Sequence, residues 1–148
     1  MVFQLLLGSL IISLTIIVQV VFMETAARTL SRSKSWFAQN GKRYRNVFAL
    51  VGVTLWLMAS HSLGVWFWAA TFLATGAFEE MEPALYFSVV SFTTLGFGDI
   101  LLPEKWRLLS GLSAANGLLI FGISTAFLVE FMSRLRRAQE AGQDGSNS

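Results

Sequence analysis

Three long apolar stretches divide this chain of 148 residues, and each is long enough to cross a membrane. Residues 3–23 carry no charge, and a helix over them spans roughly 31 Å, the thickness of a hydrocarbon core. Residues 47–78 also lack Asp, Glu, Lys and Arg, and their length predicts a tilted helix. In residues 106–132 the charges stand near the two ends, at Arg107 and Glu130. The pattern predicts three transmembrane helices.

A fourth apolar segment lies between the second and third stretches and is too short to cross. From Pro83 to Thr94 a helix would measure about 18 Å, which predicts a re-entrant helix over 83–93. Pro83 suits the first turn, where its missing N–H costs nothing. Carboxylates favour a helix N-terminus, and three of them stand there: Glu79, Glu80 and Glu82.

The charge pattern predicts the orientation. The loop of residues 24–46 holds a single acid, Glu24, and the segment 77–107 between the last two spans is mostly acidic. With three spans, the basic loop and the basic tail share one side, which the positive-inside rule makes cytoplasmic. The N-terminus then faces outward. The basic residues are Arg28, Arg32, Lys34, Lys42, Arg43 and Arg45 in the loop, and Arg134, Arg136 and Arg137 in the tail.

Composition supports a membrane protein and excludes several other classes. Hydrophobic residues make up 54% of the chain and charged residues 14%, against about a quarter charged in soluble domains. The absence of cysteine excludes disulfides, and the single histidine excludes a multi-histidine site within one chain. A net charge of +2 is too small to indicate nucleic acid. No cofactor is expected, and the polar tail, 134–148, is predicted to be disordered.

The segment Thr93-Thr-Leu-Gly-Phe-Gly-Asp99 has the chemistry of a cation filter. Such a filter replaces an ion's water shell with backbone carbonyls, and a threonine hydroxyl completes the innermost site. Successive carbonyls point to one axis only if the backbone alternates between ordinary and left-handed conformations. Gly96 and Gly98 adopt positive φ at little steric cost. Leu95 and Phe97 are expected to pack behind the strand.

Residues 82–100 resemble the pore helix and filter of tetrameric potassium channels, and match best the small bacterial pore-only type. Thr94 to Asp99 meet the family pattern at every position, with Leu95 in place of the commoner Val and Phe97 in place of Tyr. The resemblance extends over 47–132, from outer helix through pore helix and filter to inner helix. The first helix is additional to this plan.

The resemblance implies a potassium channel subunit. Its fold is an all-α membrane protein with three transmembrane helices plus a re-entrant pore helix and filter loop, 94–98, within a pore domain at 47–133. One loop supplies a quarter of the filter, which implies a homotetramer in the cell membrane. No enzyme activity is implied. K⁺ would bind at Thr94, Leu95, Gly96 and Phe97, with Gly98 completing the filter and Thr93 and Asp99 supporting it.

Several other positions carry alternatives. Gly117 is either the hinge at which the inner helix bends or a site of close helix packing. Candidates for lining a central cavity are Asn116, Phe121 and Thr125, although Asn116 is equally suited to bridging helices. His61, near the middle of its span, needs a partner at that depth, and Asn116 is the expected one; a proton-sensing role is the alternative.

Two further charged positions have competing interpretations. Glu130 either attracts cations at the cytoplasmic mouth or forms an (i, i+4) ion pair with Arg134, and we favour the pair. Asp99 either steadies the filter, as the resemblance implies, or is a solvated carboxylate at the mouth. Thr15 and Gln19, polar within the first span, are expected to pack on the second span. That helix has no repeated Arg or Lys, which excludes a voltage sensor.

Three alternatives to a potassium channel are considered. A potassium transporter carries four pore loops in one long chain, which the length here disfavours. A non-conducting membrane protein that kept the pore fold would pass no ion. A non-selective cation channel would pass Na⁺ as well as K⁺.

Overall fold

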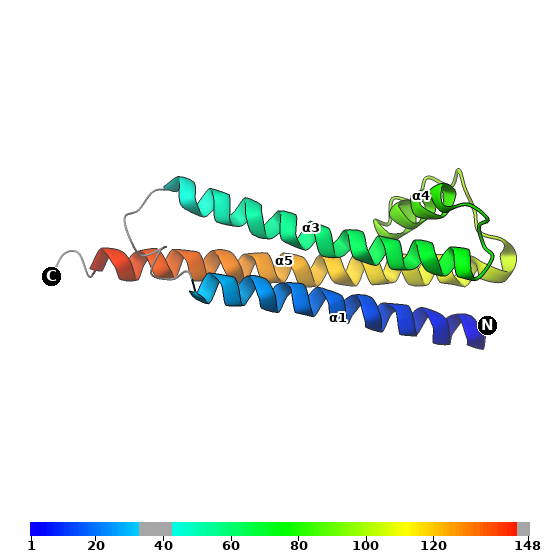
Figure 1. The fold of residues 1–148 in the computed structure, drawn as a ribbon, viewed down its shortest axis with the longest axis horizontal. Helices are drawn as coiled ribbons and strands as arrows, with labels where there is room; N and C mark the ends of the chain where they lie inside the picture. Colours follow the sequence, from blue (N-terminus) through cyan, green and yellow to red (C-terminus); the bar gives the residue numbers. More distant parts are fainter. Residues whose placement is uncertain (33–42, 145–148) are drawn as a thin grey trace.

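The computed structural model describes residues 1–32 and 43–144, and within them the chain is helical with no strand. Figure 1 shows three long helices running together, with a short helix and the N-terminus at one end. Each long helix contains an apolar span of membrane length, which confirms the three predicted membrane helices. The elements are α1 (Val2–Arg32), α3 (Arg43–Ala74), α4 (Met81–Phe92), the 3-10 turn η1 (Glu104–Trp106) and α5 (Arg107–Asp144).

The end of α3 comes earlier than the apolar run 47–78 predicts, because a glycine terminates the helix. Gly76 has φ +66° and donates its N–H to the Leu73 carbonyl, while Ala77 donates to Phe72, both at 2.9 Å. This pair of bonds is a Schellman motif, which closes a helix with a left-handed residue. Hydrophobicity therefore continues past the point at which the backbone turns.

The C-terminal tail differs from the prediction of disorder. α5 continues past Met132 to Asp144, so residues 134–144 are helical. The apolar periodicity continues past Met132, since Phe131 and Leu135 are buried one turn apart and pack with Val53. Residues 145–148, and Lys34 and Lys42 of the predicted basic loop, lie outside the described residues.

α1 packs on both α3 and α5 of its own chain. The buried positions of α1 within residues 1–30 are Gly8, Thr15 and Gln19, which share one stripe of the helix. Small and polar residues are what membrane helices use where they meet, because lipid gives apolar side chains no reason to associate. The expectation that Thr15 and Gln19 face only the second span is therefore too narrow, since α1 also faces α5.

A cysteine pair is expected to lock α1 to α5 within one chain. A Cβ placed on Gly8 lies 3.4 Å from the Leu112 Cβ, close to the roughly 3.5–4.5 Å of a disulfide. The chain has no native cysteine to interfere. Gly8→Cys with Leu112→Cys should oxidise to a species that keeps monomer mobility on a non-reducing gel. Either single cysteine variant is the control, and a reducible dimer band from the pair would place α1 on a neighbouring chain.

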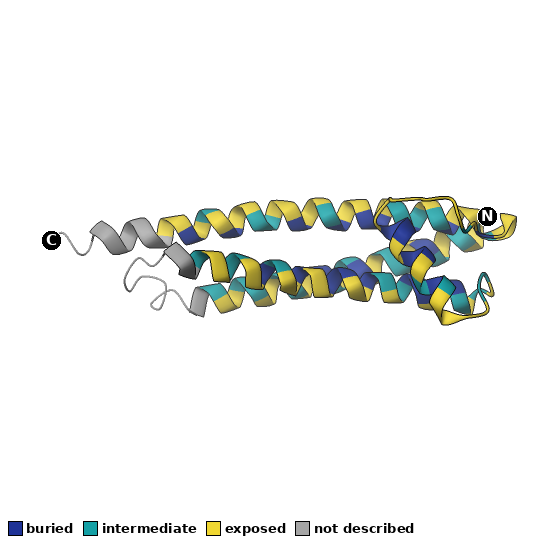
Figure 2. Ribbon diagram, turned by 90° about the horizontal axis from the view of Figure 1, so that it is seen from above, coloured by how far each residue is buried: buried dark blue, intermediate teal, exposed yellow. Residues whose placement is uncertain are grey.

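Aromatic side chains hold α4 against the long helices. Trp68 and Phe72 of α3 and Phe87 and Phe92 of α4 are buried in one cluster. Figure 2 shows buried residues gathered where α4 meets the long helices, near the N-terminal end. This cluster fixes the short helix, and with it the segment that follows.

Candidate functional site

α4 ends in a second Schellman motif, and here the left-handed residue is not glycine. Thr94 has φ +59° and donates its N–H to the Ser91 carbonyl at 2.9 Å, while Leu95 donates to Val90 at 3.0 Å. Left-handed backbone costs a residue with a Cβ about 1–2 kcal/mol. The structure therefore maintains a strained threonine at the junction between helix and loop, at the position predicted for the innermost site.

The backbone after α4 alternates in the way the filter hypothesis requires. Thr94, Gly96 and Gly98 have φ of +59°, +57° and +75°, whereas Leu95 and Phe97 between them do not have positive φ. Every second residue is thus left-handed. Because the C-terminal end of α4 carries partial negative charge, the helix adds a field that favours a cation beside this segment.

The side chains of Leu95 and Phe97 lie in the open within one chain, contrary to the expected packing behind the strand. They are 57% and 65% exposed. A hollow of about 270 Å³ lies between the loop that follows α4 and the helices α4 and α5. Its lining is Phe87, Val90, Ser91, Thr94, Gly96, Gly98, Ile100, Leu101, Ser110 and Ala114.

Asp99 is held by the short helix. Its Oδ2 accepts a hydrogen bond of 2.6 Å from the hydroxyl of Tyr86, thirteen residues earlier on α4. The bond keeps the pKa of the Asp99 carboxyl below its usual value and raises the pKa of Tyr86. This contact ties the C-terminal end of residues 94–98 to α4, the helix that precedes them. The contact favours the supporting role over a free carboxylate.

Removing the Tyr86 hydroxyl should raise the pKa of Asp99 toward its ordinary value of about 3.9. Because the pKa of Asp99 is lowered in the fold, the bond stabilises the folded protein at pH values above the ordinary pKa of an aspartate. This contribution is lost as the pH falls through the lower pKa of the folded state. A carboxyl ¹³C titration of Tyr86→Phe against the native protein measures the change. Val89→Ala, exposed on the same helix, should leave the titration of Asp99 unchanged. An unmoved Asp99 titration in Tyr86→Phe would contradict the assignment.

Gly117 packs directly against the end of α4, and we call this contact, together with that of Gly64, the glycine seat. A Cβ built on it would lie 1.7 Å from the carbonyl oxygen of Phe92, the last residue of α4. On the other side, a Cβ on Gly64 of α3 would lie 3.1 Å from the tip of the Phe92 ring. Two glycines from two helices thus hold the end of α4, and α5 is one helix through residue 117. This geometry favours close packing over a hinge.

His61 does not pair with Asn116. Its Nδ1 lies 2.6 Å from the Leu57 carbonyl, which can only accept, so Nδ1 carries a proton. Nε2 lies 3.4 Å from the Ser124 hydroxyl of α5, and the ring packs on Phe121 at 4.5 Å between centroids. Ser124 lies two turns beyond Asn116 on the same helix, so the error is one of depth.

Only one of the three cavity candidates lies on the open face of α5. Asn116 is fully buried and bonds to Thr15 of α1, and Phe121 is partly buried between His61 and Phe92. Thr125 is exposed, although its hydroxyl donates to the Phe121 carbonyl. The exposed positions that share its face include Leu118, Gly122 and Val129.

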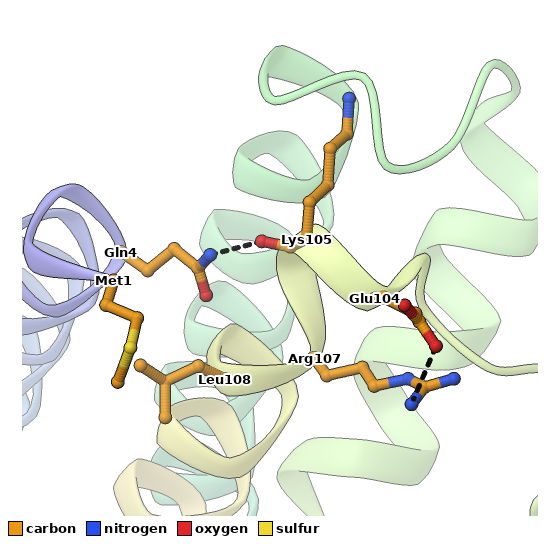
Figure 3. Close-up of a pocket in the computed structure, with 6 residues that line it drawn as sticks. All are labelled: Met1, Gln4, Glu104, Lys105, Arg107 and Leu108. Carbon is orange, nitrogen blue, oxygen red and sulfur yellow. Dashed lines mark hydrogen bonds and ion pairs between the residues drawn. The ribbon is translucent and has the colours of Figure 1, made fainter.

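Charged groups form ion pairs toward the two ends of α5, in one case with Glu104 of η1. Glu130 and Arg134 lie 2.8 Å apart, and both are more than half exposed, so the pair adds little stability. At the other end, Arg107 and Glu104 are 3.6 Å apart beside a hollow of about 670 Å³ (Figure 3). There the Gln4 amide donates to the Lys105 carbonyl and joins α1 to η1.

Sequence reasoning missed the residues that hold the site in place. Tyr86 and Phe92 lie within the segment 82–100 but were assigned no role, Gly64 belongs to no motif, and apolar or aromatic positions abound in these helices. The one available signal was the hydroxyl of Tyr86, polar within an apolar segment and without an assigned partner. Its bond to Asp99 depends on the turn after α4, which no periodicity reveals.

Comparison with known proteins identifies the domain. No curated protein and no solved structure matches the chain. The sequence profile of the family described as "Ion channel" matches residues 62–134, which include the C-terminal part of α3, all of α4, the alternating segment and most of α5. The matched range contains the glycine seat and the Tyr86–Asp99 bond. Together with three membrane-length helices, the match shows that this multi-pass membrane protein carries an ion channel domain at residues 62–134.

Proposed function

We propose that this ion channel is selective for K⁺ and that its filter is residues 94–98. The observation that carries the proposal is the left-handed backbone at Thr94, Gly96 and Gly98, directly after a helix C-terminus. Carbonyls of Thr94 to Phe97 then take the place of water around a dehydrated ion, and the Thr94 hydroxyl closes the inner site. No cofactor is involved, since K⁺ is the cargo.

The conducting unit in this proposal is a homotetramer. One chain supplies one loop, so a closed ring of carbonyls needs several copies. Two features support contact between copies: the exposed Leu95 and Phe97, and the hollow of about 270 Å³ beside them. Purified protein should have the particle mass of four 16.4-kDa chains, and a monomeric or dimeric particle would refute this assembly.

The proposed orientation places the filter and the N-terminus outside the cell. In Figure 1 the N-terminus lies at the end of the molecule that holds α4, and the C-terminus lies at the opposite end. The end of α1 that carries Arg28 and the part of α5 that carries Arg134, Arg136 and Arg137 point toward that opposite end. Basic residues at one end favour a cytoplasmic location for it, in the cell membrane.

A flux assay tests the selectivity. Purified protein in liposomes should discharge a K⁺ gradient far faster than an equal Na⁺ gradient. Equal rates for the two ions would identify a non-selective cation channel. The absence of flux for both, from a correctly assembled protein, would identify a non-conducting relative.

A further inference from the structure

The extra helix α1 is joined to the channel domain through buried hydrogen bonds rather than through apolar contact alone. Thr15 accepts a bond of 2.8 Å from the Asn116 amide of α5. One turn further along α1, the Gln19 amide donates to the Ser124 hydroxyl of α5 at 2.8 Å. Ser60 of α3 donates to the Gln19 carbonyl oxygen. These five residues, together with His61, form what we call the polar seam.

The polar seam is almost completely withdrawn from solvent and lipid. Thr15, Gln19 and Asn116 are 2%, 2% and 0% exposed, and Ser124 is 5% exposed. A polar group without a partner at that depth costs several kcal/mol, so separating α1 from α5 is costly for the amides of Gln19 and Asn116. The hydroxyls of Thr15 and Ser124 keep bonds to carbonyls of their own helices. Apolar helices slide past one another at little cost, whereas these bonds define a single register.

The seam acts on the half of α5 that lies beyond the glycine seat. Gly117 fixes α5 against α4, and Ser124 lies two turns closer to the cytoplasmic end. Farther along, Phe131 and Leu135 pack with Ala26 and Leu30 of α1. α1 therefore follows this half of the helix along most of its length.

The opposite face of α5 is exposed in the part of the chain that the structure describes. Leu118, Gly122, Thr125 and Val129 are exposed there. In a four-fold ring, this is the face left to line the passage or meet neighbouring copies. Widening the passage moves this half of α5 away from the axis, toward the space that α1 and α3 occupy.

We propose that α1 is a brace on the channel, in which the Thr15–Asn116 and Gln19–Ser124 bonds hold α5 straight and oppose its outward movement. The inference rests on the proposed function, because it assumes that α5 lines the passage. It assigns a role to a helix that lies outside the matched channel domain. At the outer end, the bond from Gln4 to the Lys105 carbonyl anchors the brace to η1.

Single-channel recording of Gln19→Leu and Asn116→Leu tests the brace. Each variant should raise the open–closed equilibrium constant by about three-fold or more, the effect expected for one interhelical hydrogen bond in a membrane. The conductance of the open channel and the ratio of K⁺ to Na⁺ permeability should stay native. Thr25→Val is the matched control, because that exposed hydroxyl of α1 bonds only to the Val21 carbonyl of its own helix.

Ser124→Ala provides a milder variant in case the leucine variants fail to assemble, since it removes one oxygen and little volume. It should act in the same direction, and combining it with Gln19→Leu should add little to the change caused by Gln19→Leu, because that variant already removes the Gln19–Ser124 bond. Native or reduced opening in Gln19→Leu, Asn116→Leu and Ser124→Ala channels would overturn the brace. The selectivity proposal is tested separately, by the permeability ratio of the native channel. These recordings measure channel opening whichever cation carries the current, so the two proposals can fail independently.

Discussion

Gly117→Ala is expected to destroy selective conduction by displacing the filter rather than by stiffening a hinge. The new Cβ would lie 1.7 Å from the Phe92 carbonyl oxygen, where real contacts stay beyond 3.0 Å. Alanine normally stabilises a helix by about 1 kcal/mol over glycine. Forcing packed backbone apart costs about 1–3 kcal/mol or more in each subunit, so the clash outweighs the gain. Because residues 94–98 start from this turn, they move with it.

Two glycines on the same helix provide matched controls for this variant. A Cβ on Gly111 or Gly122 meets nothing within 4 Å among the described residues, so alanine at either position should leave the permeability ratio near native. Permeability to K⁺ and Na⁺ in bilayers, with particle mass as the assembly check, measures the effect. A Gly117→Ala channel that keeps native selectivity and changes only its opening would support the hinge instead.

Gly64→Ala separates backbone clash from side-chain clash at the same seat. Its Cβ would meet the tip of the Phe92 ring at 3.1 Å, and a ring can turn. The effect on conduction should be milder than that of Gly117→Ala. Phe92→Leu should relieve Gly64→Ala but not Gly117→Ala, since the second clash is with a carbonyl. Equal relief of both would contradict the seat as described.

Gly96→Ala is expected to abolish K⁺ conduction through backbone strain alone. Gly96 has φ +57°, and a Cβ there costs about 1–2 kcal/mol in each chain of the proposed four-fold ring. Within residues 1–32 and 43–144 no neighbouring atom lies within 4 Å of the added Cβ, so crowding by these residues is not the cause. Liposome flux of K⁺ measures the loss.

Gly76→Ala is the control for Gly96→Ala, because it imposes the same kind of strain elsewhere. Gly76 has φ +66°, nothing within 4 Å of its added Cβ, and lies at the end of α3 outside the filter. It should lower stability by a similar amount per chain and leave K⁺ flux in place. Preserved selective flux in Gly96→Ala would show that residues 94–98 are not the filter.

The hydrophobic runs predicted the existence of every membrane helix, but not where each one ends. α3 stops at a glycine turn, although apolar residues continue, because backbone conformation and not hydrophobicity terminates it. α5 extends beyond Met132 because Phe131 and Leu135 still bury a face against α3. Composition alone had suggested a disordered tail there.

Pairings between helices were the least predictable part of the site. His61 was assigned to Asn116 from depth along the spans, yet it meets Ser124, while Asn116 bonds to Thr15. Position along an apolar run gives depth only to within about two turns, because the tilt of a helix and its register against its neighbours do not follow from its length. The motif at 94–98 was visible because its glycines are required locally, whereas its supports depend on contacts between helices.

The most direct test of the central claim is the reversal potential of the native channel with K⁺ on one side of a bilayer and Na⁺ on the other. If carbonyls replace the water around a dehydrated potassium ion, the reversal potential should lie far from zero, toward the equilibrium potential of K⁺. A reversal potential near zero would mean that both cations pass alike and would contradict the account.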